Sequence, residues 1–173
     1  MTSFKDLIVT TQQSIVNLEM RDMYQVADET EDFEEWKRTG LRDAHPYSPY
    51  WARWVDLVSS VRRRGVVLRR ARIVAEPVTD YIRYEHAGTF VRLFAGEQVR
   101  WLPRHKAVDL LLPGCDLWLF DKKYVLFSHF TGDGQRADPP FELSTDPYIL
   151  AQCSSAFDKV WERAVPHDQY ELR

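Results

Sequence analysis

Cysteine is scarce in this chain of 173 residues: it has two, Cys115 and Cys153, and neither belongs to a Cys-x-x-Cys pair. A disulfide framework or a zinc site is therefore not expected, and two isolated thiols suit a reducing compartment. No apolar run approaches the about 18 residues that a membrane helix needs. Lys5 and Asp6 interrupt the start too early for a signal peptide. We therefore expect a cytoplasmic protein.

The chain also lacks a strong excess of one charge. Its formal net charge of −3 gives no overall field for nucleic acid or an anionic membrane, so neither is expected to bind directly. It has no Gly-rich phosphate loop, nucleophile motif or metal-ligand spacing, and we expect no metal and no cofactor. Its composition, 13% aromatic and 28% charged, is globular. The length fits a single domain over residues 1–173, with 1–45 as a candidate N-terminal extension packed on the rest.

The segment 66–74 is predicted to be a strand around which the rest of the chain is organised. β-Branched residues are frequent in it, and its apolar residues fall on both faces. Arg72 lies near its C-terminal end, where open α/β folds gather ligands in the crevice above the sheet. Arg72 is therefore the first candidate binding residue.

The next segment is expected to be a helix with a polar side. Pro77 suits a first helical turn because its missing N–H costs nothing there, and Glu76, Asp80 and Arg83 would then share one side. Arg72 cannot be neutralised, so a buried Arg72 needs a carboxylate, and Glu76 and Asp80 are the nearest in sequence. Together these residues predict either a buried ion-pair network or the wall of a polar pocket.

Two further patterns supply candidate residues. His129 with Asp133 is a candidate general base with its orienting carboxylate, or else a hydrogen-bonded core histidine. Six arginines fall between positions 62 and 72 without a carboxylate, and Trp101 is an aromatic residue on which a base could stack. The arginines need not form one surface, because three of them end a helix and three alternate across a strand.

The remaining elements predict an α/β or α+β fold. Helices are expected over 4–9, through Phe33 and Trp36 up to Gly40, from Ser48 as N-cap with Pro49 in the first turn up to Gly65, within 104–112, and from 146–147 to before Pro166. Strands are expected over 14–20, 98–102, 116–120 and 124–130, with an edge strand up to 143. We expect a mixed central sheet covered by helices on both faces, with 71–73, 117–119 and 125–127 at its centre.

Several segments carry a resemblance to a known family: 18–22, 36–40, 69–84, 95–97, 99–103, 117–121, 129–134 and 156–164. On these the chain resembles, over nearly its whole length, an actinobacterial domain-of-unknown-function family whose genes often lie beside helix-turn-helix regulators of the XRE type. The resemblance implies a regulatory setting with such a regulator as a partner protein, and it implies no activity.

The element order also resembles one half of a phospholipase D-like fold. Enzymes of that fold use a His-x-Lys pair followed four residues later by Asp, whereas here His129 is followed by Thr131 and Arg136 at those positions. We therefore expect a non-enzymatic module that binds a partner protein, a small anionic ligand or both. The alternative is a phospholipase D-like hydrolase or phosphodiesterase with a degenerate site.

Overall fold

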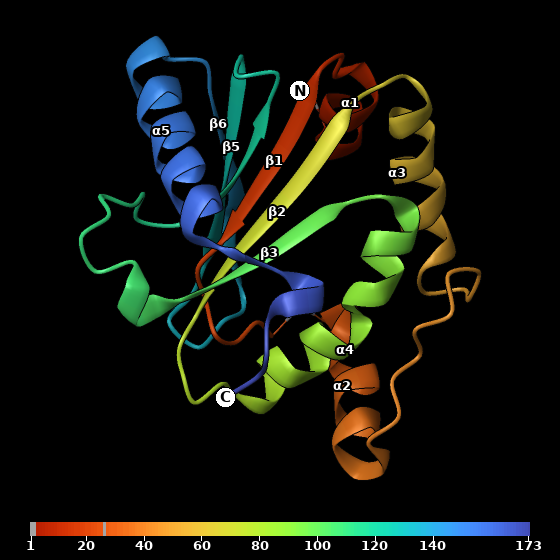
Figure 1. The fold of residues 1–173 in the computed structure, drawn as a ribbon. Helices are drawn as coiled ribbons and strands as arrows, with labels where there is room; N and C mark the ends of the chain where they lie inside the picture. The colour runs from red at the N-terminus through yellow and green to blue at the C-terminus, as the bar shows by residue number, and fades with distance from the viewer. Residues whose placement is uncertain (1–2, 26) are drawn as a thin grey trace.

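Seven strands and five α-helices lie in the part of the chain that the computed structural model describes, residues 3–25 and 27–173 (Figure 1). The strands are β1 (Ser14–Glu19), β2 (Val67–Val74), β3 (Gln98–Pro103), β4 (Asp116–Phe120), β5 (Tyr124–Phe130), β6 (Arg136–Ser144) and β7 (Val165–Pro166). The helices are α1 (Phe4–Thr10), α2 (Ala27–Thr39), α3 (Ala52–Arg63), α4 (Asp80–Ala95) and α5 (Pro147–Arg163), with 3₁₀ turns η1 (Arg104–Lys106) and η2 (His167–Gln169). Within these described ranges, no helix combines the length and the hydrophobicity that crossing a membrane requires.

All seven strands form one mixed sheet in the order β6-β5-β4-β1-β2-β3-β7. β1, β2 and β3 run parallel, and the other pairings are antiparallel. Parallel neighbours need crossover connections, and here α3 and α4 cross on the same face, beside α1, while α5 covers the opposite face (Figure 1). The predicted mixed sheet with helices on both faces is confirmed.

β2 shows how the sequence divides the core between the two faces. Ala71 and Ile73 lie in the cluster on the α5 side, together with Phe157, whereas Leu68 lies in the cluster beneath α3. Alternate residues of a strand face opposite sides, so Arg70 and its neighbour at position 72 lie on the same side as Leu68. The segments 71–73, 117–119 and 125–127 all lie in strands, as predicted.

α3 begins later than the sequence predicts. Ser48 accepts the N–H of Trp51 through its side chain, and its carbonyl accepts the N–H groups of Trp51 and Ala52. It therefore caps a single turn over 49–51, as expected of an N-cap. That turn is not continued, and the regular helix begins at Ala52 rather than at Pro49.

α4 also begins later than predicted, at Asp80 rather than at Pro77. The reason is a cap at Thr79, whose side chain accepts the N–H of Ile82. Glu76 consequently lies before the helix. The expectation that it shares a helical side with the residues at positions 80 and 83 is therefore wrong.

β6 is the outer strand of the sheet, as predicted for the segment up to 143. It pairs with β5 across an irregularity between Ser128 and Phe130. Pro139 and Pro140 lie within it. Proline has no N–H to donate to a ladder, so this pair suits an edge and would not suit a central strand.

One carboxylate ties the β4–β5 turn to the start of β1. Asp121 Oδ1 accepts the N–H groups of Gln13 (2.7 Å) and Ser14 (2.9 Å), and Oδ2 accepts that of Gln12 (2.9 Å). These hydrogen bonds lower the pKa of Asp121, although burial opposes the shift. Asp121 has a φ of 51°, which Asp and Asn adopt more readily than other residues with a side chain.

We expect Asp121→Ala to lower the free energy of unfolding by about 1–3 kcal/mol, because it leaves three N–H groups without their acceptor. Asp121→Asn keeps one carbonyl oxygen and the tolerance of positive φ, so it should lose less. Urea unfolding of the three proteins measures the order. Wild-type stability in Asp121→Ala would contradict the assigned tie.

Candidate ligand-binding site

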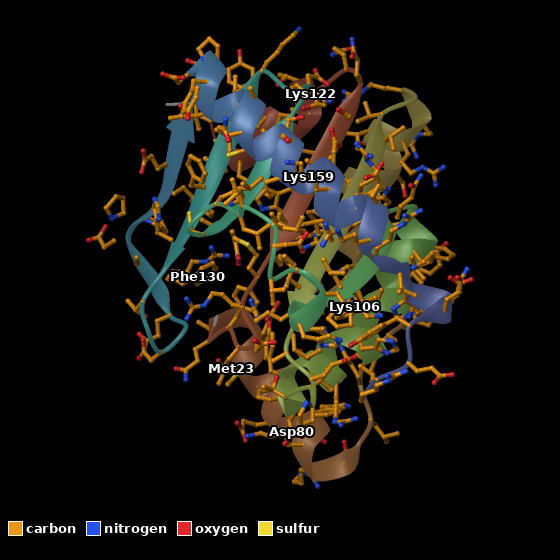
Figure 2. All side chains as sticks on the ribbon, turned by 60° about the vertical axis from the view of Figure 1, so that its left-hand side comes forward. Met23, Asp80, Lys106, Lys122, Phe130 and Lys159 are labelled. Carbon is orange, nitrogen blue, oxygen red and sulfur yellow. The ribbon has the colours of Figure 1, made fainter. Side chains whose placement is uncertain are left out.

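A cavity of about 320 Å³ lies on the α3 and α4 side of the sheet. It adjoins the C-terminal ends of β1 and β2, at Glu19 and Arg72, and the first residue of β4, Asp116. Phe130 marks its β5 side (Figure 2). Nine of its nineteen lining residues are aromatic: Phe4, Tyr24, Tyr50, Trp51, Trp54, Tyr81, Trp118, Phe130 and Phe141. Eight others are charged, and the remaining two are Asn17 and Ser128. The described lining therefore contains no aliphatic side chain.

The inner part of the lining comes from β1 and β2. Their parallel register places Glu19 beside Arg72 and Asn17 beside Arg70. Arg70 donates hydrogen bonds to Asn17 and to the Glu19 carboxylate, and Arg72 Nε lies 3.0 Å from Glu19 Oε2. Two neighbouring strands thus pair two guanidinium groups with one carboxylate.

α4 and the residue after its end extend this pairing. Glu85 and Arg92 are seven positions apart and so lie on one side of the helix. Arg72 donates a hydrogen bond to Glu85, and Arg70 Nε donates to Glu97 at 3.0 Å. Arg92 is farther from both acids, 4.0 Å from Glu85 and 3.6 Å from Glu97.

Arg42 reaches one of these acids, Glu85, from the segment between α2 and α3. Its guanidinium carbon lies 3.4 Å from the centroid of the Tyr84 ring, and its Nη2 lies 3.6 Å from Glu85 Oε1. A Cβ atom at Gly88 would lie 2.4 Å from Arg42 Nε. Gly88 therefore leaves the space that this side chain occupies.

These seven residues are called the Arg–Glu network: Arg42, Arg70, Arg72, Arg92, Glu19, Glu85 and Glu97. Burial opposes the ionisation of Glu85, but the guanidinium groups of Arg72, Arg92 and Arg42 lower its pKa to about 2. Glu85 is therefore ionised at neutral pH. Removing one partner from such a set leaves an uncompensated buried charge, which is strongly destabilising.

Asp116 also lines the cavity, but its pKa is raised, whereas that of Glu85 is lowered. Its Oδ1 accepts the N–H of Met20 at 2.7 Å, and its Oδ2 accepts the Tyr24 hydroxyl. Burial, together with the nearby Glu19 carboxylate, raises the pKa of Asp116 to about 6. Burial also raises the pKa of Glu29, which accepts a hydrogen bond from a tyrosine of α4. Two lining carboxyl groups thus take up protons more readily than exposed ones.

Two lining arginines, Arg92 and Arg136, donate no side-chain hydrogen bond to any residue that the structure describes. The Arg92 side chain is 13% exposed and only loosely paired with its acids. The Arg136 guanidinium lies over the rings of Phe130 and Phe141, 5.5 and 5.2 Å from their centroids. Both therefore have hydrogen-bond donors available for a ligand.

Arg72 is the predicted site residue that lines the cavity, but its predicted partners are wrong. It pairs with Glu19 and Glu85 instead of Glu76 or Asp80. Glu76 precedes α4 and accepts a hydrogen bond from the C-terminal segment. Asp80 is exposed at the start of α4, at the end of the molecule that α2 and α4 form (Figure 2).

Arg83 and Trp101 do not line the cavity. Arg83 is half-buried on α4. Trp101 is buried in β3, where it stacks on Tyr170 and donates its indole N–H to His167 Nδ1 at 3.1 Å. It has no exposed face on which a nucleic-acid base could stack.

The structure pairs His129 and Asp133 with different residues. His129 lies on β5, with its Nε2 3.2 Å from Glu142 on β6. Asp133 lies in the exposed turn before β6, where it accepts hydrogen bonds from Thr131 and Gln135. Neither residue lines the cavity that holds Arg72.

Sequence reasoning misses three of the residues that matter most, Glu19, Glu85 and Arg92. Glu19 ends a strand, and its pairing with Arg72 depends on the register of two parallel strands, which no local pattern encodes. Glu85 and Arg92 leave a usable signal. They interrupt the apolar side of a helix that begins at the Thr79 cap, and charges on such a side need buried partners.

A family profile described as a domain of unknown function, DUF6879, matches residues 2–172. The chain belongs to the DUF6879 family. No curated protein matches it in sequence. Among solved structures, Nuc from Salmonella typhimurium, a phospholipase D family member, is similar, with a TM-score of 0.53 and 11% identity over 94% of this chain and 86% of that chain. TrmBL2, described as an archaeal chromatin protein with a novel mode of DNA binding, aligns with a TM-score of 0.47 and 12% identity over 92% of this chain and 47% of that chain.

The similarity to Nuc shows the fold alone, because the identity is low. This DUF6879 chain thus has a phospholipase D-like α/β fold, as its element order predicts. Within the described residues, no group of three or more His, Cys, Asp or Glu side chains is arranged to hold a metal ion.

We expect Arg72→Ala in this DUF6879 domain to cost about 3–5 kcal/mol in the free energy of unfolding, because it leaves the buried Glu85 carboxylate and the half-buried Glu19 carboxylate short of a cation. Arg69→Ala is the matched control. Arg69 lies on the same strand but faces α5, where its guanidinium group lies over the rings of Phe157 and Trp161, an interaction worth about 0.5–2 kcal/mol. Denaturant unfolding compares the two variants, and equal losses would contradict the network assignment.

Asp116 gives a pH dependence of opposite sign to that of a salt-bridged acid. Its pKa is raised from 3.8 to about 6 in the folded state, so its contribution to stability is present below about pH 4 and lost as the pH rises through 6. The stability difference between wild type and Asp116→Asn should therefore fall by up to about 3 kcal/mol between about pH 4 and 7. Asp109→Asn is the control: its arginine partner lowers the pKa of Asp109 to about 2, so that difference should stay flat. A wild type to Asp116→Asn stability difference that does not change with pH would contradict the raised pKa of Asp116.

Proposed function

We propose that this DUF6879 domain is a non-enzymatic binding module whose cavity takes a small anionic ligand. The observation that carries the proposal is which of the charged groups around the cavity already have a partner. The four lining carboxyl groups already have partners: Glu19 and Glu85 pair with arginines, and Glu29 and Asp116 accept hydrogen bonds from tyrosines. Among the described lining cations, two guanidinium groups have no acceptor. These groups favour a ligand with hydrogen-bond acceptors. A carboxylate or phosphate group supplies such acceptors together with a negative charge, which strengthens the hydrogen bonds.

The alternative, a phospholipase D-like hydrolase, has less support. Phosphoryl transfer of that kind needs a nucleophile beside a cation that offsets the developing charge. The residues described as lining the cavity include no histidine, lysine or cysteine. His129 lies outside it, and Thr131 stands where the enzymes have lysine. Hydrolysis of a phosphodiester substrate that is lost in folded His129→Ala would restore the alternative.

A regulatory setting is part of the proposal. The resemblance to an actinobacterial family encoded beside XRE-type regulators makes such a cytoplasmic helix-turn-helix protein the first partner to test. α4 offers a route between ligand and partner, because one side carries Glu85 and Arg92 and the other exposes Phe90 (58%) and Phe94 (50%). Co-purification of the two proteins, with and without Phe90→Ser, measures the association.

The anion site is tested by thermal unfolding with inorganic phosphate or acetate, each compared with chloride at the same ionic strength. A ligand at ten times its Kd adds about 1.4 kcal/mol of stability, and Arg92→Gln should lose this gain. Arg100→Gln is the matched control, since Arg100 also lies over a tryptophan ring, 4.5 Å from Trp161, but outside the cavity. No gain in wild type, or an equal gain in Arg92→Gln, would overturn the proposal.

A further inference from the structure

We infer that the ligand of the cavity is a planar aromatic anion, an aromatic ring that carries a carboxylate or phosphate group. This inference rests on the proposed function. It takes the anion site at Arg92 from that proposal and adds that the anionic ligand carries an aromatic ring. It follows from three features of the cavity, namely a corner formed by two tryptophans, a cation beside that corner, and the size of the space.

The corner is formed by Trp54 on α3 and Trp118 on β4. Both side chains are half-buried and line the cavity, with ring centroids 6.2 Å apart and planes inclined at 66°. Aromatic rings prefer offset stacking or edge-to-face contact at centroid distances of about 4.5–7 Å. A planar ring that lies parallel to one of the two indoles is inclined at about 66° to the other, so a ring held in the corner can stack on one and meet the other edge-on. On Trp118 it would share the indole with the Arg70 guanidinium, whose carbon lies 5.1 Å from the ring centroid.

The cation beside the corner is Arg92. Its guanidinium carbon lies 5.7 Å from the Trp54 ring centroid and 5.3 Å from that of Trp51. An anionic substituent on a ring held at Trp54 is thus placed near guanidinium N–H groups that have no other acceptor among the described residues. Arg136 repeats the combination of cation and aromatic rings, over Phe130 and Phe141.

The size of the cavity limits the ligand. About 320 Å³ lies at the lower end of the about 300–1,000 Å³ that ligand pockets span, which suits one ring system with a short polar group rather than a peptide. The lining argues against an aliphatic acid, because its described residues include no aliphatic side chain. It also argues against a cation, because each lining carboxyl group already has a partner.

The test uses the full wild-type chain and two matched pairs of probes in isothermal titration calorimetry. Benzoate is compared with cyclohexanecarboxylate, and adenosine 5′-monophosphate with ribose 5-phosphate, so that each pair shares its anionic group and differs in the aromatic ring. We expect the aromatic member of at least one pair to bind about tenfold more tightly, as stacking on an indole predicts. The pair that shows the preference distinguishes an aromatic carboxylate from a nucleotide.

Trp118→Leu keeps an apolar side chain at the corner and removes the ring. It should abolish the preference for the aromatic member within the pair, whereas Trp161→Leu, outside the cavity, should keep that preference. If Trp118→Leu does not fold, the wild-type comparison still decides. If both members of each pair bind equally well, and Arg92→Gln abolishes that binding, the inference of an aromatic ligand is wrong and the proposed anion site is supported. Binding of none of the four probes would overturn both.

Discussion

A guanidinium group that is buried without a carboxylate is one of the costliest arrangements in a protein interior. In the Arg–Glu network the guanidinium groups of Arg42, Arg70 and Arg72 are buried, and each of them has a carboxylate partner. Arg72 is satisfied only when β1 lies beside it in the observed register, bringing Glu19, and when α4 packs over the sheet with Glu85 facing inward. The Arg–Glu network therefore couples three elements that are distant in sequence. A shift of one residue in the β1–β2 register would turn Glu19 to the other face and leave the arginines uncompensated.

The same network fixes one wall of the cavity for which ligand binding is proposed. Arg70 donates hydrogen bonds to Asn17, Glu19 and Glu97, and Arg72 donates one to Glu85 and pairs with Glu19, so both guanidinium groups are fixed in the cavity wall. Arg92 shares the same acids at longer distances, which leaves its donors free while its charge remains balanced. A fixed wall with one available cation binds with a smaller entropic loss than a set of mobile surface side chains would.

Much of the fold follows from the sequence because its strands and its last helix carry clear periodicity. Chemistry also predicts that Arg72, in the middle of an apolar strand, must find a carboxylate. Which carboxylate it finds was not predictable, for two physical reasons. Glu19 reaches Arg72 through strand register. Glu85 lies on the inward side of α4, where it pairs with Arg72, whereas Asp80 is the exposed first residue of the helix after the Thr79 cap.

The two edges of the sheet constrain how this protein associates with others. Exposed edges present unpaired N–H and C=O groups that recruit further strands. Here β7 is only two residues long, and β6 contains Pro139 and Pro140 and an irregular register. The short β7 and the prolines of β6 interrupt the ladders at the two edges, which disfavours the addition of further strands. At both edges of the sheet a second protein would therefore meet side chains rather than a long, continuous backbone ladder.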